Sequence, residues 1–423
     1  MGWVMALLPI VLLVAGFPFF VVLLGTAAVV LTFFSTIPAT AAHQVMFGAL
    51  DKYALLAVPF FIFAGDLLGR GGVSIRLVRW VQAIIGRVRG SLPFTALGTA
   101  VVFSAISGST AATVAAVGSL TYKRLREAGY SEKFSTGLLI AAGAIDNLIP
   151  PSIGFILYGI ASDTSIVKLF AAGAVPGVVL AIFFAAYIYR HAVVTGDKGG
   201  PPFRLNELVH ATRDGIWAIA APVAVLGGIY AGVFSPTEAA AVACVYAILV
   251  SWLIYREATL KDVFDSAARS MYLTGQVFVI LACAGVYSWL LTVTGLGPRL
   301  IGAITEMQLS PWALLLAVNV LLLLVGMVLD TVSAILILTP LLAPIAKAAG
   351  IDPIHFGVVV IMNLSIGTFT PPFGLNIFVG QAVFKVPLSS IYPGLVPFII
   401  AAIGALMVVT YIPQLSLFIL RFV

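Results

Sequence analysis

The chain has 423 residues, of which 61% are apolar (Ala, Val, Ile, Leu, Met, Phe, Trp, Tyr or Cys) and 9% are charged, and its formal net charge is +6. Soluble domains carry about 25% charged residues, so this composition excludes a water-soluble globular protein. The apolar residues form continuous runs instead of alternating segments of about ten residues, which excludes a lipid-facing β-barrel. We therefore expect an all-α polytopic protein in a lipid bilayer, whose basic residues encode orientation rather than nucleic-acid binding.

The apolar runs leave room for about ten crossings, at about 20 residues for each helical span. The first run, near residues 3–34, is long enough for two short spans broken near Gly16 and Pro18, and its length does not decide between one span and two. The other runs lie near residues 53–69, 93–122, 134–161, 167–190, 216–234, 237–255, 271–293, 311–346, 354–384 and 392–420.

Two stretches between the apolar runs are amphipathic. In residues 73–89, four arginines are interspersed with leucine, valine, isoleucine and Trp80. This pattern predicts a helix that lies in the membrane interface, and an ordinary loop with a solvated face is the alternative. Residues 297–307 show the same pattern more weakly.

Two of the apolar runs, 93–122 and 311–346, carry polar and small residues at their centres. A single helix over 93–122 would be roughly 45 Å long, whereas the hydrocarbon layer is roughly 30 Å thick. We therefore predict that each run folds back at its centre as a re-entrant hairpin. The alternative is a tilted span whose small residues permit close helix packing. The central residues are Ser104, Ser107, Gly108, Ser109 and Thr110 in the first run and Gly326, Asp330, Thr331 and Ser333 in the second.

The distribution of lysine and arginine favours the hairpins. With both runs as hairpins, the basic loop 123–133 lies on the same face as the arginines of 73–89 and most other basic residues. This face is cytoplasmic by the positive-inside rule, and full crossings would move the loop to the opposite face. The hairpins also leave an odd number of crossings between equivalent points of the two halves, which predicts inverted topology.

The two halves of the chain resemble each other. At a shift of 221 residues and without a gap, Thr110 meets Thr331, Pro150-Pro151 meet Pro371-Pro372, and Gly159 meets Gly380. We therefore predict an inverted structural repeat. Its parts are a first repeat 1–194 with hairpin 93–122 and broken helix 134–161, a linker 195–203, and a second repeat 204–423 with hairpin 311–346 and broken helix 354–384.

A Pro-Pro pair lies inside each of the runs 134–161 and 354–384. Proline lacks a backbone donor and clashes with the preceding turn, so each pair interrupts its helix. Non-helical backbone at bilayer depth persists only where protein or a polar cavity covers it, so the breaks indicate a transport site; a kinked structural helix is the alternative. Carbonyls at a break suit a dehydrated Na⁺, to which Ser104, Ser107 and Thr370 can add oxygens, and half-helix N-termini suit a carboxylate.

Asp146 and Asp330 are the acidic residues nearest the predicted centres, and an ionisable group within a span is a functional hypothesis by default. Asp330 could instead cap the helix that follows its hairpin turn. Asp146 could coordinate a cation, carry a proton or bond neighbouring amides, and the sequence leaves these roles open. We do not expect an enzyme, because the hydroxyls of 107–109 have no histidine at their depth to act as a base.

Four motifs at these centres resemble the large membrane (M) subunit of tripartite ATP-independent periplasmic (TRAP) transporters, and the match covers essentially the whole chain. The motifs are Phe-Ser-Ala-Ile-Ser-Gly-Ser-Thr-Ala-Ala-Thr (103–113), Leu-Ile-Pro-Pro-Ser-Ile (148–153), Leu-Asp followed by Ile-Leu-Thr-Pro-Leu-Leu (329–342), and Thr-Pro-Pro-Phe-Gly (370–374). The resemblance implies an elevator fold like that of the ion-transporter superfamily, in which hairpins and broken helices move against a scaffold. It implies sodium-coupled, binding-protein-dependent import of an organic acid across the bacterial inner membrane.

The resemblance also implies two Na⁺ sites related by the repeat, and no organic cofactor. By position, the first site would use oxygens of Ser104, Ser107, Asp146, Ile149 and Pro151, and the second those of Gly326, Gly367, Thr370 and Phe373. The substrate contacts that we predict are Ser107, Gly108, Ser109, Thr110, Asn147, Pro150, Asp330, Thr331 and Asn376. One departure is Asp146, where we would expect a small residue, so the number of cations and a proton role stay open.

Two partner chains follow from the resemblance: a small four-helix Q membrane subunit, and a soluble periplasmic protein (P) that delivers a carboxylate such as a dicarboxylate or sialic acid. No Q-like region precedes residue 1, so we expect Q as a separate chain. The substrate cannot be identified here, because selection falls to a partner chain. A self-sufficient Na⁺-coupled carboxylate carrier of related fold and a membrane scaffold without transport activity stay open as alternatives.

Overall fold

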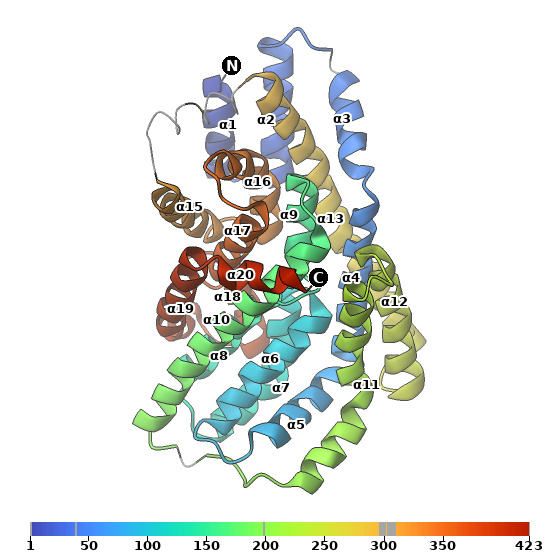
Figure 1. Cartoon of the computed structure of the whole chain (residues 1–423), viewed down its shortest axis with the longest axis vertical. Coiled ribbons are helices and arrows are strands. Elements are labelled where there is room, and N and C mark those ends of the chain that lie inside the picture. Colours follow the sequence, from blue (N-terminus) through green and yellow to red (C-terminus); the bar gives the residue numbers. More distant parts are fainter. Residues whose placement is uncertain (1, 39, 198, 296–301, 303–309, 423) are drawn as a thin grey trace.

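The computed structural model describes residues 2–38, 40–197, 199–295, 302 and 310–422. All regular structure in these ranges is helical, and no strand occurs in them, which confirms the all-α prediction. The molecule is elongated, with the N-terminal helices at one end and the connection between the two halves of the chain at the other (Figure 1). The predicted amphipathic stretch 297–307 lies outside the described residues apart from Gly302.

Six helical stretches of the described chain are long and apolar enough to cross a membrane: Tyr53–Arg70, Ile166–Val194, Pro236–Ile254, Leu260–Val293, Thr331–Ala348 and Leu388–Tyr411. The helices of the first half are α1 (Gly2–Val14), α2 (Phe19–Phe33), α3 (Thr40–Leu50), η1 (Tyr53–Leu56), α4 (Ala57–Arg70), α5 (Val73–Ile85), α6 (Ser91–Ser107), α7 (Thr110–Glu127), α8 (Glu132–Gly143), η2 (Ala144–Asn147), α9 (Ile153–Ser162) and α10 (Ile166–Val194). Those of the second half are α11 (Leu205–Tyr230), α12 (Pro236–Ile248), η3 (Leu249–Ile254), α13 (Leu260–Val293), α15 (Pro311–Gly326), α16 (Thr331–Ala348), α17 (Pro353–Gly367), α18 (Leu375–Phe384), α19 (Leu388–Tyr411), α20 (Gln414–Leu417) and η4 (Phe418–Arg421).

The first apolar run forms two short helices, α1 and α2, rather than one. The chain turns at Gly16, whose φ of 82° is one that glycine adopts without steric cost. Pro18 then precedes the first residue of α2, where a missing backbone donor breaks no intrahelical hydrogen bond. The two helices pack against each other, as Figure 1 shows at the N-terminal end.

The predicted interface helix 73–89 forms as α5 but ends earlier than expected, before Gly86, whose φ is 56°. One face of α5 is buried against α6 and α11. On the other side Arg76 lies between two carboxylates, at 2.6 Å from Glu257 and 3.5 Å from Asp214. This face is therefore held by ion pairs with α11 and with the connection before α13, rather than being a freely solvated loop.

Both predicted hairpins form as helix–turn–helix units, so neither run is one continuous helix. In the first, α6 and α7 pack against each other and turn at Gly108, whose φ is 63°. In the second, residues 327–330 connect α15 to α16, and both helices pack against α17. A polar or glycine-rich centre in an overlong apolar run was sufficient to predict the turn.

Both predicted helix breaks form at the Pro-Pro pairs. In the first, α8 continues into η2, residues 148–152 leave the helix, and α9 follows. In the second, α17 ends at Gly367, residues 368–374 are non-helical, and α18 follows. The first break is buried throughout, whereas residues 372 and 373 of the second are exposed.

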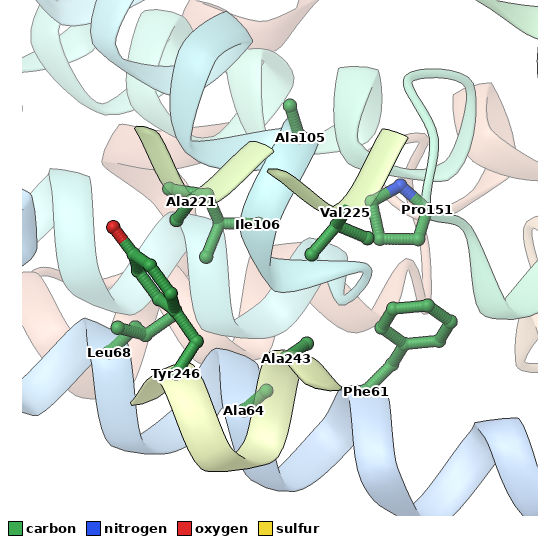
Figure 2. A pocket seen from close by; sticks show the side chains of 10 residues that line it. All are labelled: Phe61, Ala64, Leu68, Ala105, Ile106, Pro151, Ala221, Val225, Ala243 and Tyr246. Carbon is green, nitrogen blue, oxygen red and sulfur yellow. The ribbon is translucent and has the colours of Figure 1, made fainter. Parts of the chain in front are cut away.

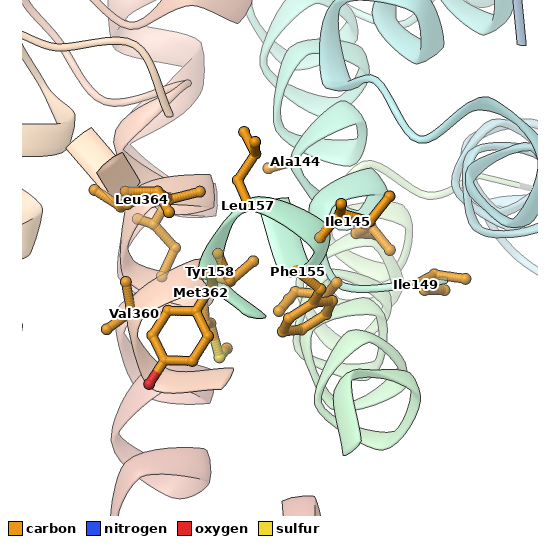
Figure 3. Packing of buried hydrophobic residues seen from close by; sticks show 14 of the residues in the cluster. Ala144, Ile145, Ile149, Phe155, Leu157, Tyr158, Val360, Met362 and Leu364 are labelled. Carbon is orange, nitrogen blue, oxygen red and sulfur yellow. The ribbon is translucent and has the colours of Figure 1, made fainter. Parts of the chain in front are cut away.

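Contacts between the two halves come in corresponding pairs. α9 packs against α16 and α18 packs against α7; likewise α10 packs against α17 and α19 against α8. The shift of 221 residues relates the members of each pair, so the contacts follow the predicted repeat. Figure 3 shows a further contact between the halves, where buried side chains of the first broken helix meet those of α17. The two halves are therefore interlocked.

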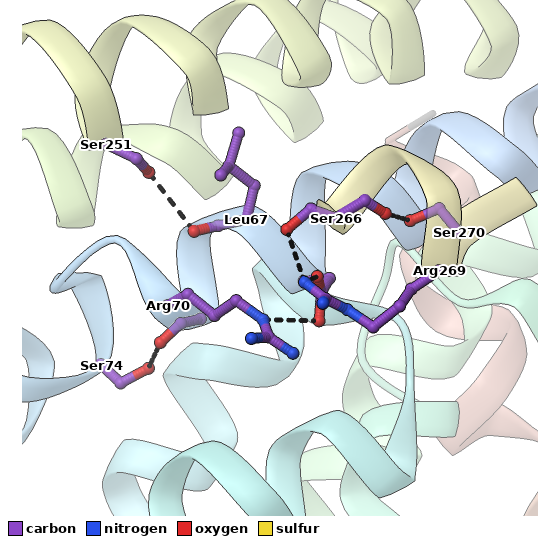
Figure 4. A network of polar contacts seen from close by, with 9 residues as sticks. Leu67, Arg70, Ser74, Ser251, Ser266, Arg269 and Ser270 are labelled. Atoms are coloured by element: carbon purple, nitrogen blue, oxygen red, sulfur yellow. Dashed lines mark hydrogen bonds and ion pairs between the residues drawn. The ribbon is translucent and has the colours of Figure 1, made fainter. Parts of the chain in front are cut away.

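Charged side chains tie α4 to α13 (Figure 4). Arg269 Nη2 donates to Asp66 Oδ2 at 2.9 Å and to Ser266 Oγ at 3.1 Å. Arg70 Nε donates to the other oxygen of Asp66 at 3.2 Å. A further bond, from Ser251 Oγ to the carbonyl of Leu67 at 3.4 Å, links α4 to η3. These contacts join α4, the end of α12 and α13 into one group of helices.

Candidate functional site

The first predicted cation set gathers around Asp146 in η2. Asp146 is fully buried, and its Oδ2 accepts a hydrogen bond from Thr113 Oγ1 of α7. The side chains of Ser104 and Ser107 on α6 lie near the same carboxyl group, and their hydroxyls donate to the carbonyls of Ala100, at 2.7 Å, and Ser109, at 3.2 Å. Asp146 Oδ1 has no hydrogen-bond partner among the described residues. A buried carboxylate oxygen without a donor is costly unless a cation or a proton compensates it, so the geometry leaves one oxygen available for such a group.

The first hairpin turn rests on the first helix break. A Cβ atom added to Gly108 would lie 2.9 Å from the carbonyl oxygen of Pro151, so only glycine allows this approach. Ile149, in the same break, directs its side chain to α10, where it lies 2.8 Å from the Cβ position of Gly177. The break therefore packs against the hairpin turn that follows Ser107, and the carbonyl of Pro151 is held beside that turn.

The second predicted cation set consists largely of main-chain atoms. A Cβ atom on Gly367 would lie 2.5 Å from the carbonyl carbon of Gly326 and 2.6 Å from its oxygen, so the ends of α15 and α17 touch backbone to backbone. Thr370 Oγ1 donates to the carbonyl of Ile366 at 2.7 Å, which leaves its lone pairs free. Phe373 is 59% exposed, and because its side chain carries no oxygen, its carbonyl is the group that could act as a ligand.

Part of the predicted substrate set is brought together across the two repeats. From the Cβ position of Gly143 on α8, the carbonyl oxygen of Thr110 lies at 3.0 Å and Nδ2 of Asn376 at 3.4 Å. Thr110 begins α7 in the first hairpin, whereas Asn376 lies on α18 of the second repeat. The first residue of α7 and the second broken helix therefore both approach α8 at Gly143.

The hydrogen bonds around Asn376 fix the orientation of its amide. Thr368 Oγ1 donates to the carbonyl of Ser365 at 2.6 Å, so it accepts from Asn376 Nδ2 at 3.1 Å. Asn376 Oδ1 is then left without a partner in the described part of the chain, and so is Nδ2 of Asn147 at the first break. Both side chains are more than nine-tenths buried, so each break presents one unpaired polar atom that a substrate, a water molecule or an ion would satisfy.

Asp330 takes the capping role that the sequence left open. Its Oδ2 accepts from the backbone N–H of Ser333 at 3.0 Å, and Ser333 Oγ donates to its Oδ1. The side chain is exposed, and its described hydrogen bonds stay within this turn. A substrate contact from Asp330 or Thr331 therefore stays a prediction, separate from the group around Asn376.

Sequence reasoning missed two residues of the site, Thr113 and Gly143. Thr113 closes the motif 103–113 and lies one helical turn after Thr110, so its position on the same face of α7 was readable. Gly143 offered no comparable signal, because one glycine within an apolar helix is common in membrane proteins. Its importance follows from the two chain segments that approach it.

A largely apolar pocket lies between the first hairpin and three other helices (Figure 2). Its floor on one side is Ala105 and Ile106 of α6 with Pro151 of the break. The facing residues are Phe61, Ala64 and Leu68 of α4, Ala221 and Val225 of α11, and Ala243 and Tyr246 of α12. We call this boundary the apolar seam. The described hydrogen bonds that link α4 to other helices through side chains run to α5, α12, η3 and α13, and none of them crosses the seam to α6.

Known proteins match this chain over nearly its full length. Residues 6–415 match the family described as "Tripartite ATP-independent periplasmic transporter, DctM component". The ectoine/5-hydroxyectoine TRAP transporter large permease protein UehC of Ruegeria pomeroyi is 38% identical over 411 residues, which cover 97% of this chain and 96% of UehC. The C4-dicarboxylate TRAP transporter large permease protein DctM of Pseudomonas aeruginosa is 40% identical over 372 residues, 88% of this chain and 87% of that protein.

A solved structure shares the fold. The crystal structure of the Alcanivorax borkumensis YdaH transporter, described as having an unusual topology, superposes with a TM-score of 0.68 over 96% of this chain and 98% of that one. Its sequence identity is 15%, so the likeness concerns the fold alone. The family match and the two permeases establish more: this chain belongs to the DctM family of TRAP transporter large permease subunits.

Proposed function

We propose that this chain is the permease subunit of a sodium-coupled importer of a small carboxylate, placed in the bacterial inner membrane and working as an elevator. The observation that carries the proposal is the buried group at the first break, where one oxygen of the fully buried Asp146 carboxyl group has no hydrogen-bond partner among the described residues and the side chains of Ser104 and Ser107 lie near that group. Hard cations such as Na⁺ take oxygen ligands of these kinds. The carboxylate of Asp146 would give this site a negative charge that the small residue expected at this position would not supply.

A second Na⁺ would bind the carbonyls of Gly326, Gly367 and Phe373 together with the hydroxyl of Thr370. The ends of α15 and α17 converge at this point, and helix C-termini carry partial negative charge that favours a cation. The carboxylate of the substrate would bind amide donors at helix N-termini such as that of α7, whose cap residue Ser109 makes no side-chain capping bond. The two named permeases differ in substrate, so the individual substrate is not assigned.

The apolar seam supports the elevator part of the proposal. Its residues are apolar apart from the hydroxyl of Tyr246, and four of them are alanines, so little specific bonding would be lost if α6 and the first break slid past α4, α11 and α12. The helices on the α4 side are bonded to one another, which suits a static scaffold. The moving body would comprise both hairpins and both broken helices.

The partners in this proposal are a small Q membrane subunit and a periplasmic binding protein. The decisive experiment is reconstitution in liposomes with a labelled carboxylate supplied on its binding protein. Uptake should require an inward Na⁺ gradient, Q and the binding protein together. Uptake driven equally by a K⁺ gradient would contradict sodium coupling, and uptake by this chain alone would favour a self-sufficient carrier.

The elevator motion needs its own experiment. In a background with Cys244 and Cys283 changed to serine, Ala64→Cys with Ala105→Cys places a thiol on each side of the seam. Cross-linking this pair should abolish uptake, and reduction should restore it. The matched control, Ala64→Cys with Ala243→Cys, joins two helices of the scaffold and should leave uptake intact. Full uptake with the first pair cross-linked would exclude sliding at this seam.

A further inference from the structure

A chain of buried hydrogen bonds runs through the second repeat, apart from every residue assigned so far. Asn363 Nδ2 on α17 donates to Asn319 Oδ1 on α15 at 2.7 Å. Asn319 Nδ2 in turn donates to Thr410 Oγ1 on α19 at 3.1 Å. All three side chains are fully buried, in a region otherwise packed with aliphatic residues. Three helices are thus joined by side-chain bonds where apolar contacts alone would leave their relative register poorly specified.

The chain continues to the C-terminal segment through His355 on α17. His355 Nε2 lies 3.2 Å from the carbonyl oxygen of Thr410, which can only accept, so this nitrogen carries the hydrogen. His355 Nδ1 lies 3.4 Å from Ser416 Oγ of α20. His355 is 2% exposed. Thr410 is therefore bound at its carbonyl by His355 and at its hydroxyl by Asn319, and the hydroxyl oxygen accepts because an amide nitrogen can only donate.

The amide pair lies on the contact line that leads to the second cation set. Asn363 is four residues before Gly367 on α17, and Asn319 is seven residues before Gly326 on α15. Residues spaced by four and by seven share one face of a helix. The Asn319–Asn363 bond and the Gly326–Gly367 contact are therefore successive contacts of one helix pair, and the directional bond fixes the register in which the two glycines meet.

The first repeat has no counterpart of this chain. At the shift of 221 residues, Asn319, Asn363 and Thr410 correspond to Gly98, Ala142 and Tyr189, and His355 corresponds to Phe134. The first cation set can adjust through the rotamers of Ser104, Ser107 and Asp146. The second set has Thr370 as its one side-chain ligand, so its geometry depends on where the two backbones are placed.

We infer that Asn319 and Asn363 are positioning residues for the second cation site, and that Thr410 and His355 hold them in place. The inference rests on the proposed sodium coupling. The amides do not touch the ion; they set the register of α15 against α17, and so place the carbonyls of Gly326 and Gly367. Partners behind the direct ligands of a metal commonly affect its affinity by 10- to 100-fold.

The test uses the full chain purified in lipid nanodiscs, with Na⁺ affinity read from the Na⁺-dependent rise in melting temperature and K⁺ as the ionic-strength control. Thr410→Val removes the hydroxyl and keeps the shape, whereas Thr410→Ser keeps the hydroxyl. Asn319→Leu removes both amide bonds. The matched control is Ser365→Ala, a buried α17 residue whose hydroxyl bonds only the carbonyl of Ile361, at 2.7 Å.

Asn319→Leu should raise the Na⁺ concentration for half-saturation roughly tenfold. Thr410→Val should raise it by a smaller factor, while Thr410→Ser and Ser365→Ala should match the unmodified chain. Should Asn319→Leu fail to fold, the Thr410 pair alone decides. Unchanged half-saturation in Thr410→Val and in any folded Asn319→Leu overturns the positioning role. No difference between Na⁺ and K⁺ in the unmodified chain is a separate result, which removes the proposed sodium coupling and the inference with it.

Discussion

Gly326 and Gly367 touch through their backbones, close enough that a Cβ atom on Gly367 would lie 2.6 Å from the carbonyl oxygen of Gly326. Neither glycine has a positive φ, so the requirement is for space rather than for an unusual backbone conformation. The contact brings together the C-terminal ends of two helices, where carbonyl groups lack intrahelical partners. Such a pair of ends is a natural place for a cation, and the contact is the simplest feature of the site to test.

Gly367→Ala should separate these two helix ends. The added methyl group meets backbone atoms, which cannot move aside as a flexible side chain could, so we expect Na⁺-dependent uptake to fall at least tenfold through weakened Na⁺ binding. The measurement is the Na⁺ dependence of uptake in reconstituted liposomes. Gly227→Ala is the matched control, because nothing lies within 4 Å of the Cβ position in that helix. A Gly367→Ala protein with an unchanged Na⁺ titration would show that these carbonyls hold no ion.

Much of the fold could be predicted from the sequence, because a lipid bilayer restricts the length, the hydropathy and the backbone hydrogen bonding of the segments that cross it. An apolar run too long for one span and polar at its centre predicted the turn at Gly108, and Pro-Pro pairs predicted both breaks. The end of α5 at Gly86 was missed, because arginines continue the amphipathic pattern through residue 89 although the backbone turns earlier. The end of a helix depends on single residues and is hard to predict, whereas a membrane span depends on the average hydropathy of about 20 residues.

The sequence predicted which segments form the candidate site, but it did not predict which residues of those segments contact one another. The family resemblance implied that Ser104, Ser107 and Asp146 belong to one group, whereas the repeat and the helix breaks alone indicated only the segments that meet. No sequence pattern indicated that Asn376 of the second repeat would meet Gly143 of the first, because this contact arises from the interlocking of two halves. The sequence also could not decide whether Asp330 contacts a ligand or caps the following helix, because both roles require an acidic residue at this position.

Thr370→Val should weaken the second cation site while leaving the fold intact. The Thr370 hydroxyl donates to the carbonyl of Ile366, so its oxygen can still accept a cation, and valine removes that oxygen at nearly constant volume. The expected result is a Na⁺ half-saturation several-fold higher, with roughly 1 kcal/mol lost in stability for the missing hydrogen bond. Thr370→Ser keeps the oxygen and should behave like the unmodified chain. Equal titrations for valine and serine would exclude Thr370 as a ligand.

Ser107→Ala provides the corresponding change at the first site. The residue is 1% exposed and its side chain lies near Asp146, so alanine removes one oxygen without opening the surface. We expect reduced Na⁺ dependence of uptake at normal expression, measured beside Ser119→Ala, whose exposed hydroxyl bonds the carbonyl of Ala116 on the outer part of α7. A transport scaffold without cation sites would tolerate both changes alike.

Asp146→Asn should have opposite effects on stability and on Na⁺ binding. Without Na⁺, a charged carboxylate at this buried position would have one oxygen unpaired and no compensating charge, so a neutral amide of the same shape should raise the melting temperature in Na⁺-free buffer at a pH high enough to ionise the carboxyl group. With Na⁺, the variant should gain much less stability than the unmodified chain, because the ligand charge is gone. Thr113→Val removes the donor to Asp146 and should instead lower the Na⁺-free melting temperature. Identical Na⁺ responses in Asp146→Asn and the unmodified chain would remove Asp146 from the cation set.

The linker between the repeats supplies a prediction outside the membrane-spanning helices. Asp197 accepts hydrogen bonds from the N–H groups of Gly90, at 3.0 Å, and Gly199, at 2.8 Å, and from the hydroxyl of Tyr130. The linker therefore holds both ends of the first hairpin, since Gly90 precedes α6 and Tyr130 follows α7. Burial raises the pKa of Asp197, but these three hydrogen bonds outweigh it, and the pKa lies below its ordinary value.

Asp197→Asn should therefore cost stability at neutral pH and little in acid. A lowered pKa in the folded state means that the stabilisation is complete above the unfolded pKa of about 3.9 and is lost as the pH falls through the lower folded value. Because the side chain is only partly buried and the interaction is therefore screened by solvent, we expect about 1 kcal/mol or less at pH 7. The measurement is the melting temperature of both proteins between about pH 7 and pH 3. Glu207→Gln, which breaks an exposed pair with Arg204 at 3.4 Å, is the matched control and should leave the melting temperature nearly unchanged at pH 7. A gap between Asp197→Asn and the unmodified chain that stays constant over this range would show that the ionised carboxylate contributes nothing to holding the hairpin.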